Sequence, residues 1–506
     1  MKMKRYSLES AREELAALQR RMAAFDHATG LIYFDGATAA PKETAANRGA
    51  TLAVLSEERY LMASSSGTAE LLGYLEGRAG ELSPKERRQV ALMLKKIRRL
   101  EKIPVGEYVE AEKLGVESEA AWHRAKQDSD FKSFRPFLQR MFDTKKRFAI
   151  YADPGSDPYD SCLGYYEEGL TKKTLDAFFE ALRKEIVPLL AEVCAAPQID
   201  DSFRYGDFPE DAQEKLAYYL METVGLDLGH VGLTVTEHPF TTSLGSHFDE
   251  RITTHYQRGD LLASFYSVVH ESGHALYDTG SASDLAYTVL DGGAAMSIHE
   301  SQSRFYENII GRSLAFCRLV FPKIAGLFPE QTRGKGPEDL YLAANRVAPS
   351  LIRTDADELT YCLHVMVRYE LEKRMFDGEI TASDLPSEWD RLYREYLGIE
   401  VPDDRRGVLQ DMHWSGGLIG YFPSYALGSA YGAQFLAKMR ETVDVEACVE
   451  AGDFGPVNDW NREHIWKHGR LFSPSELLER VLGAPFDPGY YVDYLKKKYS
   501  SVYRLG

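Results

Sequence analysis

Apolar residues recur at three- and four-residue spacing along most of the chain, which is the period of an amphipathic helix. The spacing is clearest over residues 7–34, 171–194 and 212–226. Ser10 followed by Glu13 has the pattern of a capping box and predicts the start of the first helix. The pattern therefore predicts a mainly α protein.

Strand character is confined to a short part of the sequence. Residues 231–243 and 248–256 alternate in polarity and are rich in β-branched residues, which predicts a small hairpin or sheet. Loop-like breaks fall at 195–211, 326–340 and 397–407, and none is long or low in complexity. No internal repeat is visible. We therefore predict one large helical unit over residues 1–506 with a small β element.

The composition is that of a globular protein with a large core. Hydrophobic residues make up 44% of the 506 residues and charged residues 27%. The net charge of −17 argues against nucleic acid or an anionic membrane as the main partner. Five scattered cysteines argue against a disulfide framework, and neither a secretory signal nor an apolar run of about 20 residues is visible. We expect a cytoplasmic protein.

A pair of histidines at helical spacing gives the clearest chemical indication. His270 and His274 stand four residues apart in HESGH, so about 40° separates them around a helix axis. Zinc favours such nitrogen ligands, and a catalytic zinc site keeps one position open for water. Glu271 follows the first histidine and is the predicted general base of a metalloprotease. The alternative is a structural pair of histidines without a metal.

The site needs a third ligand, and Glu300 is the candidate. It lies 26 positions after His274, as expected for a glutamate on a following helix. An isolated helix glutamate is more often solvated, so this prediction depends on the spacing. Beside it, His299 and Arg304 are weaker candidates for substrate contact or for support of the metal ligands.

A di-iron site is the competing interpretation of the same residues. Glu271 and His274 form Glu-x-x-His, which is half of a di-iron carboxylate pattern. Such a site needs a second Glu-x-x-His, and no other histidine has a glutamate three residues before it. The zinc interpretation is therefore preferred.

Short motifs along almost the whole chain carry a family resemblance. Six of them occur in order: HPF (238–240), D-x-R-x-T (249–253), HESGH (270–274), HESQ (299–302), I-R-x-x-A-D (352–357) and G-x-x-Q-D-x-H-W (407–414). One such motif is modest evidence, but six in order are specific. The sequence resembles the carboxypeptidase Taq family of zinc metallocarboxypeptidases, which are gluzincin-type HExxH enzymes.

This resemblance implies both a fold and an activity. The fold would be a helical body around a deep groove, similar to neurolysin, with a small sheet beside the metal helix and N-terminal helices overhanging the cleft. The activity would be zinc-dependent release of single C-terminal amino acids from peptides with a free C-terminus, with broad preference. Cobalt would substitute for zinc, and the protein would form a homodimer.

Roles for further residues follow from this implied activity. A guanidinium suits a substrate carboxylate best, and Arg353 is the preferred anchor because of its motif, with Arg251 and Arg304 as alternatives. By analogy with related helical zinc peptidases, a histidine and a tyrosine stabilise the oxyanion. His413 and Tyr425 are the preferred pair for this role, and Tyr421 is nearly as good a candidate. His238, from the β element, is the candidate for holding substrate backbone. An equally good interpretation of His238 is a structural histidine before a cis or turn proline.

Two rival functions remain open from the sequence. An oligoendopeptidase would use the same zinc chemistry without a carboxylate anchor. A catalytically silent binding protein would keep zinc only for structure, although a structural site has no need of Glu271 as a base.

Overall fold

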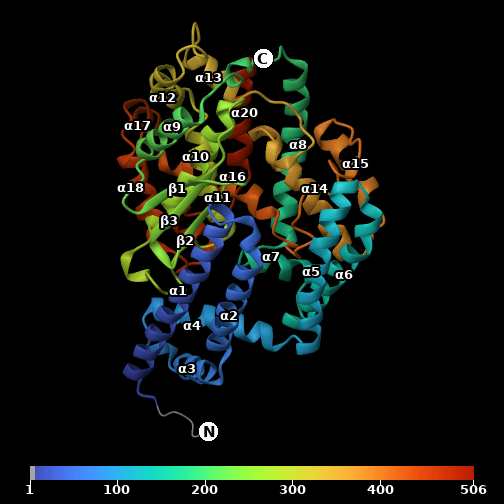
Figure 1. The fold of residues 1–506 in the computed structure, drawn as a ribbon, viewed down its shortest axis with the longest axis vertical. Coiled ribbons are helices and arrows are strands. Elements are labelled where there is room, and N and C mark those ends of the chain that lie inside the picture. Colours follow the sequence, from blue (N-terminus) through green and yellow to red (C-terminus); the bar gives the residue numbers. More distant parts are fainter. Residues whose placement is uncertain (1–5, 506) are drawn as a thin grey trace.

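Helices make up most of the structure, a computed structural model that describes residues 6–505. These residues form a single sheet of three strands (Figure 1). The prediction of a mainly α fold with a small sheet is therefore confirmed. Within residues 6–505, no helix combines the length and the apolar character needed to cross a membrane.

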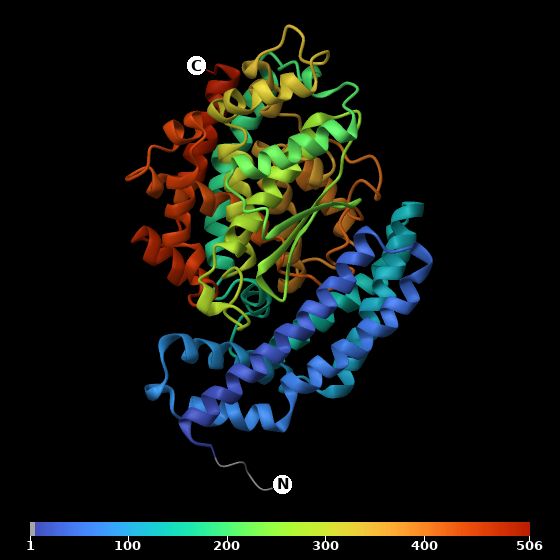
Figure 2. The ribbon, with the colours of Figure 1, turned by 60° about the vertical axis from the view of Figure 1, so that its left-hand side comes forward.

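The N-terminal helices project from the main body (Figure 2). They are α1 (Leu8–Thr38), α2 (Ala45–Ser64), α3 (Ser66–Glu76) and α4 (Pro84–Glu101). Apolar side chains of α1, α3 and α4 form a hydrophobic cluster separate from the main core. The predicted start of α1 was wrong by three residues. Ser7 is the N-cap and Ser10 its reciprocal partner, because the Ser7 hydroxyl already accepts the Ser10 N–H.

The next helices join this part to the core. They are α5 (Val105–Asp128), α6 (Phe131–Ala152), α7 (Pro158–Tyr166) and α8 (Lys172–Ala195). α8 buries Leu175, Phe178, Leu182, Ile186 and Leu189 along one face, at the spacing that the sequence predicted.

The sheet has strand order β1-β3-β2. Its strands are β1 (Val231–Val235), β2 (Thr241–Leu244) and β3 (Ser246–Thr254). β1 runs parallel to β3, and β2 runs antiparallel to β3. Gly245, at φ +77°, makes the tight turn between β2 and β3, where a Cβ would lie 2.8 Å from the Cβ of His27 in α1. The turn at 236–240 divides the first predicted β segment into two strands.

The rest of the chain builds the core around the sheet and the helix after it. Its helices are α9 (Glu210–Thr223), α10 (Leu261–Thr279), α11 (Met296–Arg304), α12 (Leu314–Leu327), α13 (Pro337–Ala344), α14 (Glu358–Asp377), α15 (Leu385–Leu397), α16 (Pro423–Met439), α17 (Val445–Ala451), α18 (Gly455–His464), α19 (Pro474–Leu482) and α20 (Gly489–Tyr503). A π-helical turn, Phe305–Ile310, continues α11. α10 packs on β3 and against α11, and α11 packs against α16. That the whole chain is one domain stays a prediction.

Candidate metal centre and active site

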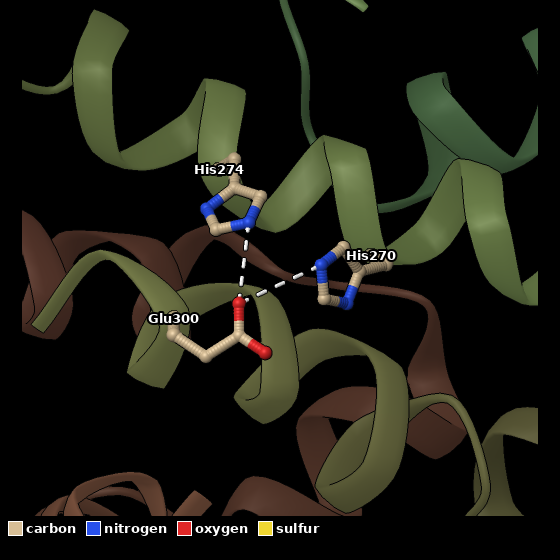
Figure 3. A group of neighbouring side chains, drawn as sticks. All are labelled: His270, His274 and Glu300. Atoms are coloured by element: carbon tan, nitrogen blue, oxygen red, sulfur yellow. Dashed lines mark ion pairs between the residues drawn. The ribbon is translucent and has the colours of Figure 1, made fainter. Parts of the chain in front are cut away.

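His270 and His274 lie on α10 and face away from its buried stripe. Of their side-chain surfaces, 18% and 16% remain exposed, so solvent reaches both imidazoles. Both Nε2 atoms face the same carboxylate oxygen of Glu300 on α11, at 3.8 Å and 3.6 Å (Figure 3). The structure thus brings together the three metal ligands that the sequence predicted.

Two glycines allow the three helices around this site to touch. A Cβ on Gly273 of α10 would lie 2.6 Å from the carbonyl oxygen of Gln302 in α11. A Cβ on Gly428 of α16 would lie 2.6 Å from the Cβ and Cγ of Glu300. Since any side chain at either position would push α11 away, the position of Glu300 depends on both contacts.

The second nitrogen of each imidazole is held by an outer partner. His270 Nδ1 lies 2.8 Å from Glu307 Oε2, and His274 Nδ1 lies 2.5 Å from His299 Nδ1. His299 Nε2 in turn lies 2.9 Å from an oxygen of Asp278. With His299 neutral and donating to Asp278, its Nδ1 accepts the proton of His274 Nδ1. Both metal-facing Nε2 atoms then carry free lone pairs, so the donor set fits a divalent metal ion.

Arg304 supports the carboxylates of this site. Its Nε donates to Glu300 Oε1 at 2.7 Å and its Nη1 to Glu307 Oε2 at 3.1 Å. Its guanidinium also lies 4.1 Å from the ring centre of Tyr361. Burial alone would raise the pKa of Glu300 and of Glu307, but the Arg304 charge and the nearby imidazoles outweigh it and lower both. Both groups are therefore anionic and suited to hold a cation and an imidazole N–H.

A role for Glu307 at this site was not predicted from the sequence. It lies seven residues after Glu300, in the π-helical turn, where the extra residue per turn changes which side chains face the site. Arg312 Nη2 donates to its Oε1 at 3.0 Å, so both its oxygens are engaged. A carboxylate two turns after Glu300 was visible in the sequence, but the π-helical turn that orients it was not.

We expect Glu307→Gln to weaken metal binding by about 10- to 100-fold, because an uncharged amide polarises the His270 imidazole less. Competition with a chelating dye measures the affinity. Glu358→Gln is the matched control, since Glu358 is also a buried carboxylate but binds Lys498 at 2.5 Å instead of an imidazole. Equal metal affinities in the two variants would contradict the support role of Glu307.

Glu271, the predicted general base, is buried beside the metal ligands. The Thr241 hydroxyl from β2 donates to its Oε2 at 2.5 Å, so the sheet contributes a direct contact to this carboxylate. Burial raises the pKa of Glu271, and the neighbouring His270 and the Thr241 hydroxyl only partly oppose the rise. A carboxylate in this environment can exchange a proton with a bound water.

His413, Tyr421 and Tyr425 form an aromatic cluster at the start of α16. His413 Nε2 lies 3.1 Å from the Tyr425 hydroxyl, and the rings of Tyr421 and Tyr425 are 5.1 Å apart. Tyr425 lies one turn before Gly428 on α16, which places it near Glu300. Burial lowers the pKa of His413 to about 4 and raises that of Tyr425, so both groups are neutral near neutral pH.

Arg353 is buried, with 5% of its surface exposed, and it is already paired. Its Nε and Nη2 donate to one oxygen of Asp411, at 3.2 Å and 2.9 Å, and its Nη1 donates to the Tyr361 hydroxyl. Asp411 also accepts two bonds from the buried Arg368. Two guanidinium groups therefore share one carboxylate, and Arg353 lies 4.8 Å from the ring centre of Tyr425.

Three other predicted residues lie away from the metal ligands or behind them. Arg251 is on β3, half-exposed and bound to Asp249 at 2.6 Å. His238 is exposed in the turn between β1 and β2, and no peptide bond of residues 6–505 is cis. His299 packs behind His274, where it contacts a metal ligand and Asp278.

Two imidazoles on α10, a carboxylate on α11 and a buried glutamate directly after the first imidazole are the residue set of a metal-dependent hydrolase. The family model for the carboxypeptidase Taq (M32) metallopeptidases matches residues 14–499. The chain belongs to this family, and it is a metallocarboxypeptidase, as the sequence resemblance predicted.

Individual relatives agree with this assignment. Carboxypeptidase 1 of Bacillus subtilis (strain 168) is 39% identical over 495 residues, which is 97% of this chain and 99% of that protein. Thermostable carboxypeptidase 1 of Pyrococcus furiosus is 35% identical and is covered to 98%. The crystal structure of the M32 carboxypeptidase from Deinococcus radiodurans R1 superposes with a TM-score of 0.95 at 35% identity, covering 98% of this chain and 100% of that one.

Proposed function

We propose that this metallocarboxypeptidase uses zinc and releases single amino acids, with broad preference, from peptides that have a free C-terminus. The observation that carries the proposal is the convergence of His270 Nε2 and His274 Nε2 on one oxygen of Glu300. Two nitrogens and one oxygen are a common ligand set of catalytic zinc, and cobalt suits the same donors. When bound, the metal would lower the pKa of a water and polarise the scissile carbonyl.

Glu271 acts as the general base and acid. It accepts a proton from the attacking water and delivers it to the leaving amine. The Thr241 hydroxyl, bound to its Oε2, fixes the direction of the carboxylate. The buried position of Glu271 supports this role, since burial brings the pKa of a carboxyl closer to neutral pH.

Tyr425 and His413 stabilise the oxyanion, with Tyr421 as the alternative donor. A hydroxyl whose pKa is raised stays protonated and can donate to developing negative charge. The bond between His413 Nε2 and the Tyr425 hydroxyl keeps the two side chains together.

Arg353 anchors the substrate carboxylate. An arginine has five N–H donors, and Asp411 and Tyr361 use three of those of Arg353. Because Arg353 and Arg368 share one aspartate, the pair leaves a net positive charge beside Tyr425, which favours an anion. We propose that the exposed His238 contacts substrate backbone and that Arg251 is a secondary anchor, whereas the position of His299 favours support of His274.

Timed mass spectrometry of matched peptides tests this proposal. We expect stepwise loss of single C-terminal residues from free-acid peptides, slow attack on the C-terminally amidated forms, and no cleavage after treatment with a chelator. Adding zinc back should restore activity. Internal cleavage of both peptide forms would indicate an oligoendopeptidase, and turnover in chelator would exclude the metal mechanism. The homodimer and the cytoplasmic location stay predictions.

A further inference from the structure

Glu372 on α14 binds both ends of the turn that lies between His413 and Tyr421, two members of the aromatic cluster. The side chain is completely buried. Trp414 Nε1 donates to its Oε1 at 2.6 Å, and the backbone N–H of Gly420 donates to its Oε2 at 2.8 Å. The Tyr159 hydroxyl of α7 supplies a third bond, at 2.8 Å to Oε2. One carboxylate thus holds two points of the chain that are six residues apart.

These two points directly adjoin candidate site residues. Trp414 follows His413, and Gly420 precedes Tyr421. The residues between them form turns rather than a helix or strand, and the turns are closed by backbone bonds from the Leu418 N–H to the His413 carbonyl and from the Gly417 N–H to the Trp414 carbonyl. These local bonds shape the turn, whereas its position against the core depends on what holds its two ends.

The fit around Gly420 leaves this end of the turn little freedom. Gly420 has φ +88°, and a Cβ there would lie 3.0–3.1 Å from backbone atoms of Cys162 and Leu163 in α7. The segment is thus pressed on α7 on one side and bonded to Glu372 on the other. A displacement at Gly420 would move Tyr421 directly.

A carboxylate suits this position because all of its neighbours can donate. Trp414 Nε1 and the Gly420 N–H are donors only, so a neutral amide at position 372 would turn its NH2 group toward one of them. Burial raises the pKa of Glu372 to about 7, against the three hydrogen bonds, which lower it. Those bonds offset only part of the cost of burying the charge.

We infer that Glu372 is a positioning residue of this enzyme, which sets where His413 and Tyr421 stand relative to the metal centre. The inference rests on the proposed function, since it assigns those two side chains to the reaction. Glu372 itself does not touch the substrate. Its effect on turnover passes through the hydrogen bonds to Trp414 and Gly420.

The test compares Glu372→Gln with Glu358→Gln, a second buried glutamate at the start of the same helix, whose partners Tyr494, Lys498 and Tyr499 lie in α20. All rates are expressed per folded, metal-loaded enzyme. We expect Glu372→Gln to lower kcat by about 10- to 100-fold with little change in KM. Glu358→Gln should leave kcat unchanged. Trp414→Phe removes one donor and should lower kcat in the same direction, which keeps the test usable if Glu372→Gln fails to fold.

A double-mutant cycle with His413→Ala separates positioning from general stability. If Glu372 acts through His413, Glu372→Gln should cost little more in the His413→Ala enzyme than that variant has already lost. Losses that stay fully multiplicative in both the His413→Ala and the Tyr421→Phe enzymes, or a normal kcat in Glu372→Gln, would overturn the inference while the proposed function stands. A normal kcat in both His413→Ala and Tyr421→Phe would overturn the roles of these two residues and the inference with them.

Discussion

Replacing Glu271 by glutamine is expected to lower kcat by about 100- to 10,000-fold, the range attributed to a general base. The amide keeps the shape of the side chain and can still accept the Thr241 hydroxyl, but it cannot take a proton from water. The metal ligands His270, His274 and Glu300 are untouched. Metal content should therefore stay at the level of the unmodified protein, as measured by inductively coupled plasma mass spectrometry.

The control for this variant is a change that removes the metal instead. Glu300→Gln should lose both activity and bound metal, whereas Glu271→Gln should lose activity alone. Near-normal turnover in Glu271→Gln would show that Glu271 is not the general base. Loss of metal from that variant would show that Glu271 contributes to binding as well.

The second large effect concerns Arg353. We expect Arg353→Met to lower kcat/KM on free-acid peptides by about 30- to 5,000-fold, which corresponds to about 2–5 kcal/mol for a buried charged hydrogen bond. Hydrolysis of the amidated peptides, which have no carboxylate to anchor, should change far less. The ratio of the two rates is the measurement, because a general loss of folded protein cancels in it.

Arg368→Met is the matched control for that experiment. Arg368 binds the same Asp411, and its guanidinium is fully occupied by Asp411, Gln410, Tyr393 and the His364 carbonyl. It has no donor left for a substrate, so its loss removes positive charge near the anchor but no direct contact, and the ratio of free-acid to amide rates should fall far less than in Arg353→Met. Equal ratios in both variants would remove Arg353 from the anchor role.

Local sequence patterns predicted most of the secondary structure and the placement of neighbouring side chains on it. The helical period predicted the fold class, and the four-residue spacing of His270 and His274 placed both on one face of α10. The strands overlap the predicted β segments, although β2 ends one residue later, at Leu244, and β3 begins two residues earlier, at Ser246. Their order could not be predicted, since β1 pairs with β3 and not with β2, the next strand along the chain. The strand order depends on how the sheet packs against α10 and α1. These contacts between distant segments cannot be read from a local sequence pattern.

Contacts between distant segments were the part that could not be predicted. Arg353 pairs with Asp411, which lies 58 residues further along the chain. Glu372 on α14 accepts a hydrogen bond from Trp414, which lies in a turn outside that helix. The ligand role of Glu300 was predicted from a spacing, whereas the outer partners Glu307 and Asp278 depend on a π-helical turn and on an imidazole bridge. Such partners are recognised only when the helices have been placed.

The close contacts at Gly273 and Gly428 tie the hydrolytic site to the cooperative unfolding of the core. α10, α11 and α16 touch backbone to backbone or backbone to ligand, so the ligands cannot separate unless these helices do. Amide protons of these three helices should therefore exchange with solvent only through opening of the main core, more slowly than those of the N-terminal cluster. In this region, separation of the metal ligands and unfolding of the core are therefore one equilibrium.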